Sequence, residues 1–234
     1  MKKIILSVSC LLASAFAFAG GNGIKGDGSG VLSNGFYINL GAAFPTLTWI
    51  KNDNISTNTI PFWVQEQKIG TQPNIEIGNQ WYFYHNDNFG VGLKAGWFQF
   101  GYSAYTNTNG FNVFNNGAIK SSALDLRVLK VAPMVSYAIN DDFAIDGSFE
   151  FAPSLIYLME QEKGNPGRND LVGTVMGGIT FSPGLRIRYT MFCLGYDYNF
   201  GTLYGKGTIP DGTSDETDMS QKIAGSRVYL GLKF

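Results

Sequence analysis

The sequence is poor in the residue types that build disulfide-rich, metal-dependent or highly charged proteins. Its 234 residues include only 2 cysteines and 1 histidine, and 15% of them are charged, whereas a soluble globule carries about a quarter. Cys10 lies in an N-terminal apolar stretch that resembles a removable signal, which leaves Cys193 alone in the mature chain. A disulfide framework and a cysteine-based metal cluster are therefore excluded.

The chain also lacks an apolar stretch long enough for a membrane-spanning helix, which needs ~20 residues. The longest candidate, 171–185, is interrupted by four glycines and by Pro183. The N-terminal stretch is shorter still and has the features of a secretory signal: Lys2 and Lys3, an apolar run, and Ala17-Phe18-Ala19. We expect residues 1–19 to be removed and residues 20–34 to form a short periplasmic segment.

Charge and length limit the partners and the number of domains. Without the signal, 15 basic residues face 18 acidic ones, a net charge near −3, so nothing suggests binding to nucleic acid. The length suits one domain, which we expect over residues 35–234. No phosphate-binding loop, EF-hand pattern or histidine cluster is present, and we expect neither a cofactor nor a bound metal.

Glycine and aromatic residues are abundant instead, with 30 glycines and 15% aromatics. From Gly35 onward, apolar and polar residues alternate with the period of two that is typical of strands with one apolar face. Charged residues occupy one face only. Eight strands are predicted, at about 36–44, 74–83, 89–97, 124–139, 143–151, 174–188, 192–200 and 226–234.

Two of these strands are irregular. In the fourth, the alternation changes phase near Leu129 to Pro133, which predicts a β-bulge with one extra residue. In the sixth, Pro183-Gly184 predicts another local irregularity.

The links between strands alternate in length. Three are short, around Asn86, Asn140 and Thr190, and the first two are rich in turn-forming residues. Four are long, at about 45–70, 103–123, 158–170 and 205–221. Short turns at one end and long loops at the other are typical of outer-membrane β-barrels, whose short turns face the periplasm.

The last strand, Ser226 to Phe234, resembles the C-terminal signature of bacterial outer-membrane β-barrels. An aromatic residue ends the chain, and apolar residues precede it at every second position: Val228, Leu230, Leu232 and Phe234. In that family this strand closes the barrel and is recognised by the barrel-assembly machinery, so the resemblance implies the same roles for these four residues.

The whole mature chain is similar to the small OmpX/OmpW-type porin-like family. The resemblance implies an all-β fold: an eight-stranded antiparallel up-and-down transmembrane β-barrel with short periplasmic turns and long extracellular loops. It also implies a monomer in the cell outer membrane, in contact with membrane lipids and lipopolysaccharide. The alternative is a secreted soluble barrel, whose apolar side chains would point inward.

An eight-stranded barrel has an interior just wide enough for side chains to fill it. Arg186, Asp197 and Asp146 should lie at similar heights on adjacent strands and could pair. The inward charges form either an ion-pair network that fills the interior or a charged constriction in a narrow channel. The residues predicted to point inward are Glu76, Lys94, Lys130, Asp146, Glu150, Arg186, Arg188, Asp197, Arg227 and Lys233.

The long loops carry aromatic residues in segments that should face water. These residues either fold over the barrel mouth, extend the strands beyond the membrane, or contact an unknown extracellular ligand; they are Trp49, Phe62, Trp63, Phe111 and Phe114. The leading hypothesis is a non-enzymatic barrel for envelope structure and surface recognition or adhesion. The alternative is a narrow porin-like channel for ions or small apolar solutes. An enzyme is not expected, because the single histidine, His85, falls in a periplasmic turn, away from any nucleophile at the outer rim.

Overall fold

The computed structural model describes residues 31–49, 67–86, 88–107, 119–161, 171–208 and 216–234. No helix in this described part of the chain is long and apolar enough to cross a membrane. Its strands are β1 (Gly35–Trp49), β2 (Gln67–Lys68), β3 (Gln72–His85), β4 (Phe89–Asn107), β5 (Ile119–Ala138), β6 (Phe143–Gln161), β7 (Leu171–Tyr189), β8 (Phe192–Thr208) and β9 (Glu216–Lys233).

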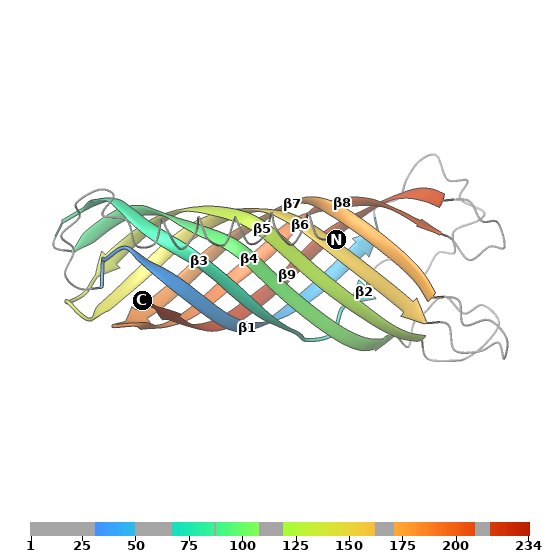
Figure 1. The fold of residues 1–234 in the computed structure, drawn as a ribbon, viewed down its shortest axis with the longest axis horizontal. Helices are drawn as coiled ribbons and strands as arrows, with labels where there is room; N and C mark the ends of the chain where they lie inside the picture. Colours follow the sequence, from blue (N-terminus) through green and yellow to red (C-terminus); the bar gives the residue numbers. More distant parts are fainter. Residues whose placement is uncertain (1–30, 50–66, 87, 108–118, 162–170, 209–215) are drawn as a thin grey trace, which may run out of the picture.

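The strands form one closed sheet (Figure 1). Each long strand pairs antiparallel with the next, and β1 pairs with both β3 and β9. The contact between β1 and β9 extends from Tyr37 opposite Lys233 to Trp49 opposite Gln221. A closed sheet satisfies its backbone groups internally, as a protein surrounded by lipid must.

The two-residue β2 continues the line of β3, so the barrel has eight strands. β1 pairs with Gln72 of β3 at Ala43 and with Lys68 of β2 at Thr46. Between these pairs, the Ile69 N–H donates to the Pro45 carbonyl at 3.1 Å. The predicted eight-stranded antiparallel barrel is confirmed.

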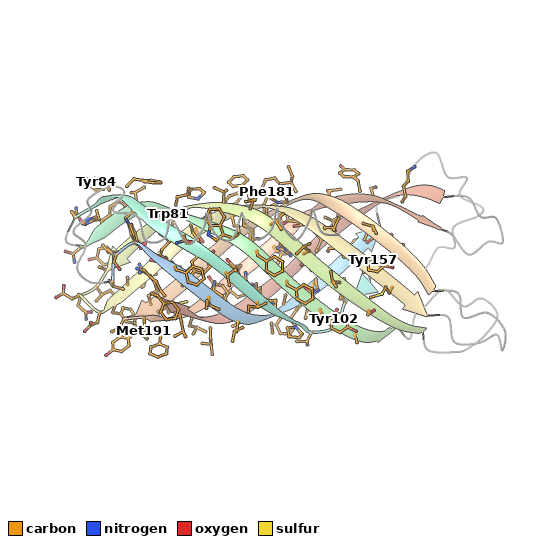
Figure 2. The ribbon with its side chains drawn as sticks, viewed as in Figure 1. Trp81, Tyr84, Tyr102, Tyr157, Phe181 and Met191 are labelled. Carbon is orange, nitrogen blue, oxygen red and sulfur yellow. The ribbon has the colours of Figure 1, made fainter. Side chains whose placement is uncertain are left out.

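Successive side chains of each strand point to opposite sides of the barrel wall (Figure 2). In β1, Leu40 is 60% exposed while its neighbour Asn39 is fully buried. In β9, Leu230 is 67% exposed while Arg227 is 5% exposed. The polar face therefore points inward and the apolar face outward, so the soluble barrel with an apolar interior is excluded.

One extra residue in β4 changes its phase. Ile77 of β3 lies opposite Phe98, but the next residue, Gly78, lies opposite Gly96, which leaves Trp97 without a partner on β3. Before this bulge the outward residues of β4 have odd numbers, such as Val91, and after it they have even numbers, such as Phe98 and Tyr102. The sequence did not predict this bulge, because Trp97 and Phe98 are both apolar and hide the change of phase.

The bulge predicted in β5 is confirmed. The register between β5 and β6 shifts between Arg127 and Val131, and Leu129 has a positive φ of 53°. The register between β4 and β5 has no shift. Leu129 therefore lies opposite Trp97, and the β4–β5 hairpin carries one extra residue on each strand at the same level.

The irregularity predicted at Pro183-Gly184 is only partly correct. Pairing with β8 skips Ser182 and Pro183, since proline has no N–H to donate, but the register on both sides of the gap is the same. Pairing with β6 is continuous. β7 therefore keeps its alternation throughout and has no bulge there.

Three short turns join the strands at one end of the barrel. In the first, the Asn86 side chain accepts hydrogen bonds from the backbone N–H groups of Asn88 and Phe89. In the second turn, the Asn140 side chain accepts hydrogen bonds from the backbone N–H groups of Asp142 and Phe143. In the third turn, Thr190 has a φ of 51°. Asparagine at these positions favours tight turns because its side chain replaces a backbone acceptor.

The strands are longer than predicted, and the long links are correspondingly shorter. β1 continues to Trp49, β4 to Asn107, and β5 begins at Ile119. At ~3.3 Å per residue, strands of this length exceed the ~9–11 residues that cross a bilayer. His85, expected in a turn, is the last residue of β3. The predicted signal, 1–19, lies outside the described residues.

Candidate functional site: the barrel interior

The barrel interior is filled by layers of side chains, and the inward residues of β6 pass through most of them. From the turn end they include Ala144, Asp146, Glu150, Ile156 and Leu158, all buried. Ala144 packs on the N-terminal segment, the two carboxylates lie in charged clusters, and the last two belong to an apolar cluster.

Glu76 lies at the centre of a charged layer. Its carboxylate is 3.4 Å from Lys94 Nζ, 3.1 Å from Lys130 Nζ and 2.5 Å from Arg227 Nη2. The Tyr37 hydroxyl donates a further hydrogen bond to it at 2.8 Å. Four strands thus converge on one carboxylate.

Glu150 and Asp197 complete this layer, and we call the six charged residues the central network. Glu150 pairs with Lys130 at 2.8 Å and with Lys94 at 3.6 Å. Asp197 pairs with Arg227 at 3.3 Å. The members are Glu76, Lys94, Lys130, Glu150, Asp197 and Arg227. With three acids and three cations, the central network is electrically balanced.

The turn-end cluster lies below it and consists of Asp146, Arg186, Arg188 and Lys233. The Nε atoms of Arg186 and Arg188 both lie 2.7 Å from Asp146 Oδ2. Arg186 therefore pairs with Asp146 at the same level, as the sequence suggested. It does not pair with Asp197, whose partner is Arg227.

One buried ion pair was not identified from the sequence. Asp125 and Arg127 on β5 lie 2.8 Å apart and are 2% and 5% exposed. The alternation of Leu124 and Leu126 in the same strand already implied that the residues between them point inward. The phase change in β5 obscured that signal.

The N-terminal segment Val31–Asn34 closes the turn end, and we call it the N-terminal plug. Val31 and Leu32 are buried against Tyr82, Met134, Ala138 and Ala144. Arg188 Nη1 donates to the Val31 carbonyl. Lys233 Nζ donates to the same carbonyl at 3.3 Å and to the Ser33 hydroxyl at 3.0 Å. The predicted periplasmic segment thus ends inside the barrel mouth.

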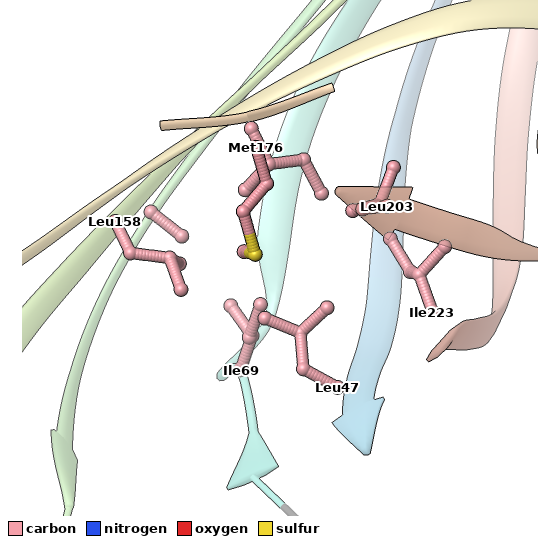
Figure 3. Close-up of a cluster of buried hydrophobic side chains, with 8 residues drawn as sticks. Leu47, Ile69, Leu158, Met176, Leu203 and Ile223 are labelled. Carbon is pink, nitrogen blue, oxygen red and sulfur yellow. The ribbon is translucent and has the colours of Figure 1, made fainter. Parts of the chain in front are cut away.

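Apolar side chains fill the opposite end (Figure 3). They come from strands all round the barrel and are nearly or fully buried, so they seal the interior above the charged layers. This loop-end cluster consists of Leu47, Ile69, Ala123, Ile156, Leu158, Met176, Leu203 and Ile223.

A small polar cavity lies between the central network and Arg127. Its volume is about 20 Å³, and a single water needs ~10–15 Å³. Gln99, Arg127, Glu150 and Asp197 are among its lining residues. The cavity can hold about one water.

The C-terminal signature lies on the outer face of β9. Val228, Leu230 and Phe234 are exposed, and Leu232 is half-buried. The Phe234 backbone exchanges two hydrogen bonds with Phe36 of β1, at 2.8 and 3.1 Å. The last residue of the chain therefore contributes directly to closing the barrel.

The residues predicted for surface contact are mostly outside the described part of the chain. Phe62, Trp63, Phe111 and Phe114 lie there. The link was predicted to begin near residue 45, but β1 continues to Trp49, opposite Gln221, which agrees with the alternative that the strands extend into the link.

The described residues hold no group of three or more His, Cys, Asp or Glu that could bind a metal ion. His85 lies at the turn end, opposite Gly90. The thiol of Cys193 is buried and lies 3.7 Å from Asn39 Oδ1. Neither side chain contacts a nucleophile or a proton relay in the described structure.

Aromatic side chains surround the outside of the barrel near both ends, among them exposed Tyr84 at the turn end and Tyr102 towards the loop end (Figure 2). A closed sheet that buries its charges and exposes its apolar side chains is stable only where lipid surrounds it. The chain is therefore an integral outer-membrane β-barrel protein of the Gram-negative type.

Comparison with known proteins gives similar solved structures but no family. No family model and no curated protein matches the chain. Ail, the attachment invasion locus protein of Yersinia pestis, in complex with the heparin analogue sucrose octasulfate, is 12% identical, with 86% of this chain and 99% of Ail covered and a TM-score of 0.44. OprG from Pseudomonas aeruginosa is 14% identical over 88% and 98% of the two chains, with a TM-score of 0.42. The outer membrane protease OmpT from Escherichia coli is 11% identical over 86% and 96%, with a TM-score of 0.48.

Proposed function

We propose that this protein is a non-enzymatic, non-conducting barrel that supports the outer membrane and presents its long loops for recognition or adhesion at the cell surface. The observation that supports this proposal is the filled interior. The N-terminal plug, the two charged clusters and the loop-end cluster succeed one another along the barrel axis.

The energetics of the central network also favour a closed interior. Opening a path for hydrated ions would separate Glu76 from cations that lie 2.5 to 3.4 Å away. Removing one partner of a buried ion pair costs ~3–5 kcal/mol, because the other charge is left uncompensated. Thermal motion would seldom open such a network.

In a non-conducting barrel, the long loops would be the part of the protein that meets a partner outside the cell. Phe62, Trp63, Phe111 and Phe114 are the proposed contact residues, and Trp49 would mark the boundary between barrel and loop. The ligand is an extracellular molecule with an apolar or aromatic surface. Lipopolysaccharide would surround the barrel on this side, and the barrel would act as a monomer.

Planar-bilayer recordings of the purified protein test the closed interior. We expect no conductance steps. The double variant Leu203→Ala/Met176→Ala, which thins the loop-end cluster, should stay silent because the charged layers remain. Steady steps in the unmodified protein, altered by Asp197→Asn, would establish the rival function, a narrow channel.

Surface recognition needs a separate test. Cells that display the protein should adhere to host matrix or cell layers more than cells that display a variant with Phe62, Trp63, Phe111 and Phe114 replaced by serine. The variant must reach the surface in equal amounts. Equal adhesion by the two strains would contradict the role of these residues.

A further inference from the structure

The turn-end cluster carries an unbalanced positive charge. Arg186, Arg188 and Lys233 are 4%, 0% and 7% exposed, and Asp146 is the carboxylate that pairs with this group among the described residues. The two arginines alone outnumber the single acid, so the turn-end cluster keeps uncompensated positive charge, whereas the central network is balanced.

Neutral groups provide the remaining contacts of these cations: oxygens, the Met134 sulfur and the Tyr82 ring. Lys233 Nζ is bonded to the carbonyls of Val31 and Ser33 and to the Ser33 hydroxyl. Arg188 donates to the Val31 carbonyl and, at 2.6 Å, to the Tyr82 hydroxyl. Dipoles of this kind solvate a cation but do not neutralise it, and uncompensated buried charge is costly.

Two donors in the same cluster have no acceptor. Arg186 Nη2 donates to Gln80 Oε1 at 2.6 Å, which places the Gln80 amide against the guanidinium. Arg186 Nη1 and Gln80 Nε2 are both buried without a hydrogen-bond partner. Gln80 is fully buried and Arg186 is 4% exposed. Unpartnered buried donors are rare and call for an explanation.

We propose that the turn-end cluster binds a monovalent anion of about the size of chloride, held by Arg186 Nη1 and Gln80 Nε2. The positive charge of Arg186 and Arg188 attracts the anion. Two free donors match a halide, whereas a tetrahedral oxyanion would need partners for four oxygens. The anion enters from the periplasmic side, where the N-terminal plug covers the cluster.

The anion would neutralise part of the positive charge of the cluster, whose cations now donate hydrogen bonds to Val31 and Ser33. Binding therefore links the N-terminal plug to the barrel wall, because the same cations hold both. Because the anion binds the folded protein, it should raise the free energy of unfolding by RT ln(1 + [anion]/Kd).

The test is thermal unfolding of the full-length protein, refolded in detergent, as chloride replaces gluconate at constant ionic strength. We expect the unfolding midpoint to rise with chloride, in step with the logarithm of its concentration once this exceeds the Kd. Bromide should substitute for chloride, and crystals soaked in bromide should show an anomalous peak beside Arg186 Nη1 and Gln80 Nε2.

Gln80→Leu removes one of the two donors and should abolish the chloride dependence. Gln221→Leu is the matched control, because Gln221 is also fully buried with an unpartnered amide but lies near the loop end. Gln221→Leu should keep the full dependence. Equal midpoints in chloride and gluconate, or equal dependence in the two variants, would overturn the proposal.

Discussion

Glu76 illustrates how single residues hold this barrel together. Its carboxylate is fully buried and contacts Lys94, Lys130, Arg227 and Tyr37. In a low-dielectric interior, the three cations depend on this carboxylate for neutralisation.

Glu76→Gln should lower the free energy of unfolding by ~3–5 kcal/mol, because it leaves three buried cations with two carboxylates. Urea unfolding of the protein in lipid vesicles measures the effect. Lys222→Gln, on the exposed outer face of β9, should change stability by less than ~0.5 kcal/mol. Similar losses in the two variants would show that the central network contributes little.

Gly195 is needed because a tyrosine ring lies over it. A Cβ at this position would be 2.1 Å from Tyr229 Cζ. Tyr229 has little room to move, since its ring is buried and lies 4.6 Å from the Arg227 guanidinium.

Gly195→Ala should therefore destabilise the barrel by ~1–3 kcal/mol through overpacking. Gly147→Ala is the control, because its nearest neighbour, Val135 Cγ2, would lie at an ordinary 3.7 Å. We expect that control to be neutral or slightly stabilising when unfolding is followed by tryptophan fluorescence. A harmless Gly195→Ala would mean that the Tyr229 ring moves aside freely.

At the scale of elements, the β4–β5 hairpin behaves as a unit. Trp97 and Leu129 are extra residues that lie opposite each other, so the hairpin keeps its own register while it shifts against β3 and β6. Trp97 also covers the outward-facing Asn79, to which its Nε1 donates at 2.7 Å.

Deleting Trp97 and Leu129 together should cost less than the sum of the two single deletions. Each single deletion leaves an unmatched residue between β4 and β5, whereas the double deletion restores a regular ladder. A coupling free energy of ~0.5–3 kcal/mol is expected for residues in direct contact. A double-deletion cycle of unfolding free energies measures it, and strict additivity would contradict the paired bulge.

At the scale of the whole molecule, closure of the barrel depends on the pairing of its first and last strands, β1 and β9. β9 pairs with both β8 and β1. The final contacts, between Phe36 and Phe234, are made by the backbone. The side chain of Phe234 is therefore free to act during assembly without contributing to these hydrogen bonds.

Phe234→Ala should reduce the amount of barrel in the outer membrane of cells while leaving refolding in detergent nearly unchanged. Leu230→Ala, at a similarly exposed position on the same face, should assemble more efficiently than Phe234→Ala. Outer-membrane fractions run with and without heating measure the folded barrel by its altered gel mobility. Equal assembly of the two variants would remove the special role of the terminal aromatic residue.

The sequence by itself determined which side chains point inward and which point outward within each regular stretch of strand, but not beyond the bulge at Trp97 in β4. This holds because facing depends only on local alternation: a residue in an extended strand points opposite to its neighbours. The predicted inward residues Glu76, Lys94 and Arg188 are all buried, and the phase change in β5 was visible because Leu124, Leu126 and Val128 are out of step with Val135 and Tyr137.

Only the tertiary structure decided which inward residues meet. In a narrow barrel, side chains on opposite walls touch, so Arg186 contacts Gln80, 106 positions away in the sequence. The N-terminal plug enters the same interior, so Lys233 contacts Val31, 202 positions away. Local alternation carries no information about such distant contacts. For that reason the N-terminal plug and the charge imbalance at the turn end emerge only from the closed barrel, and the pairing of Asp197 with Arg227 depends on the register between β8 and β9.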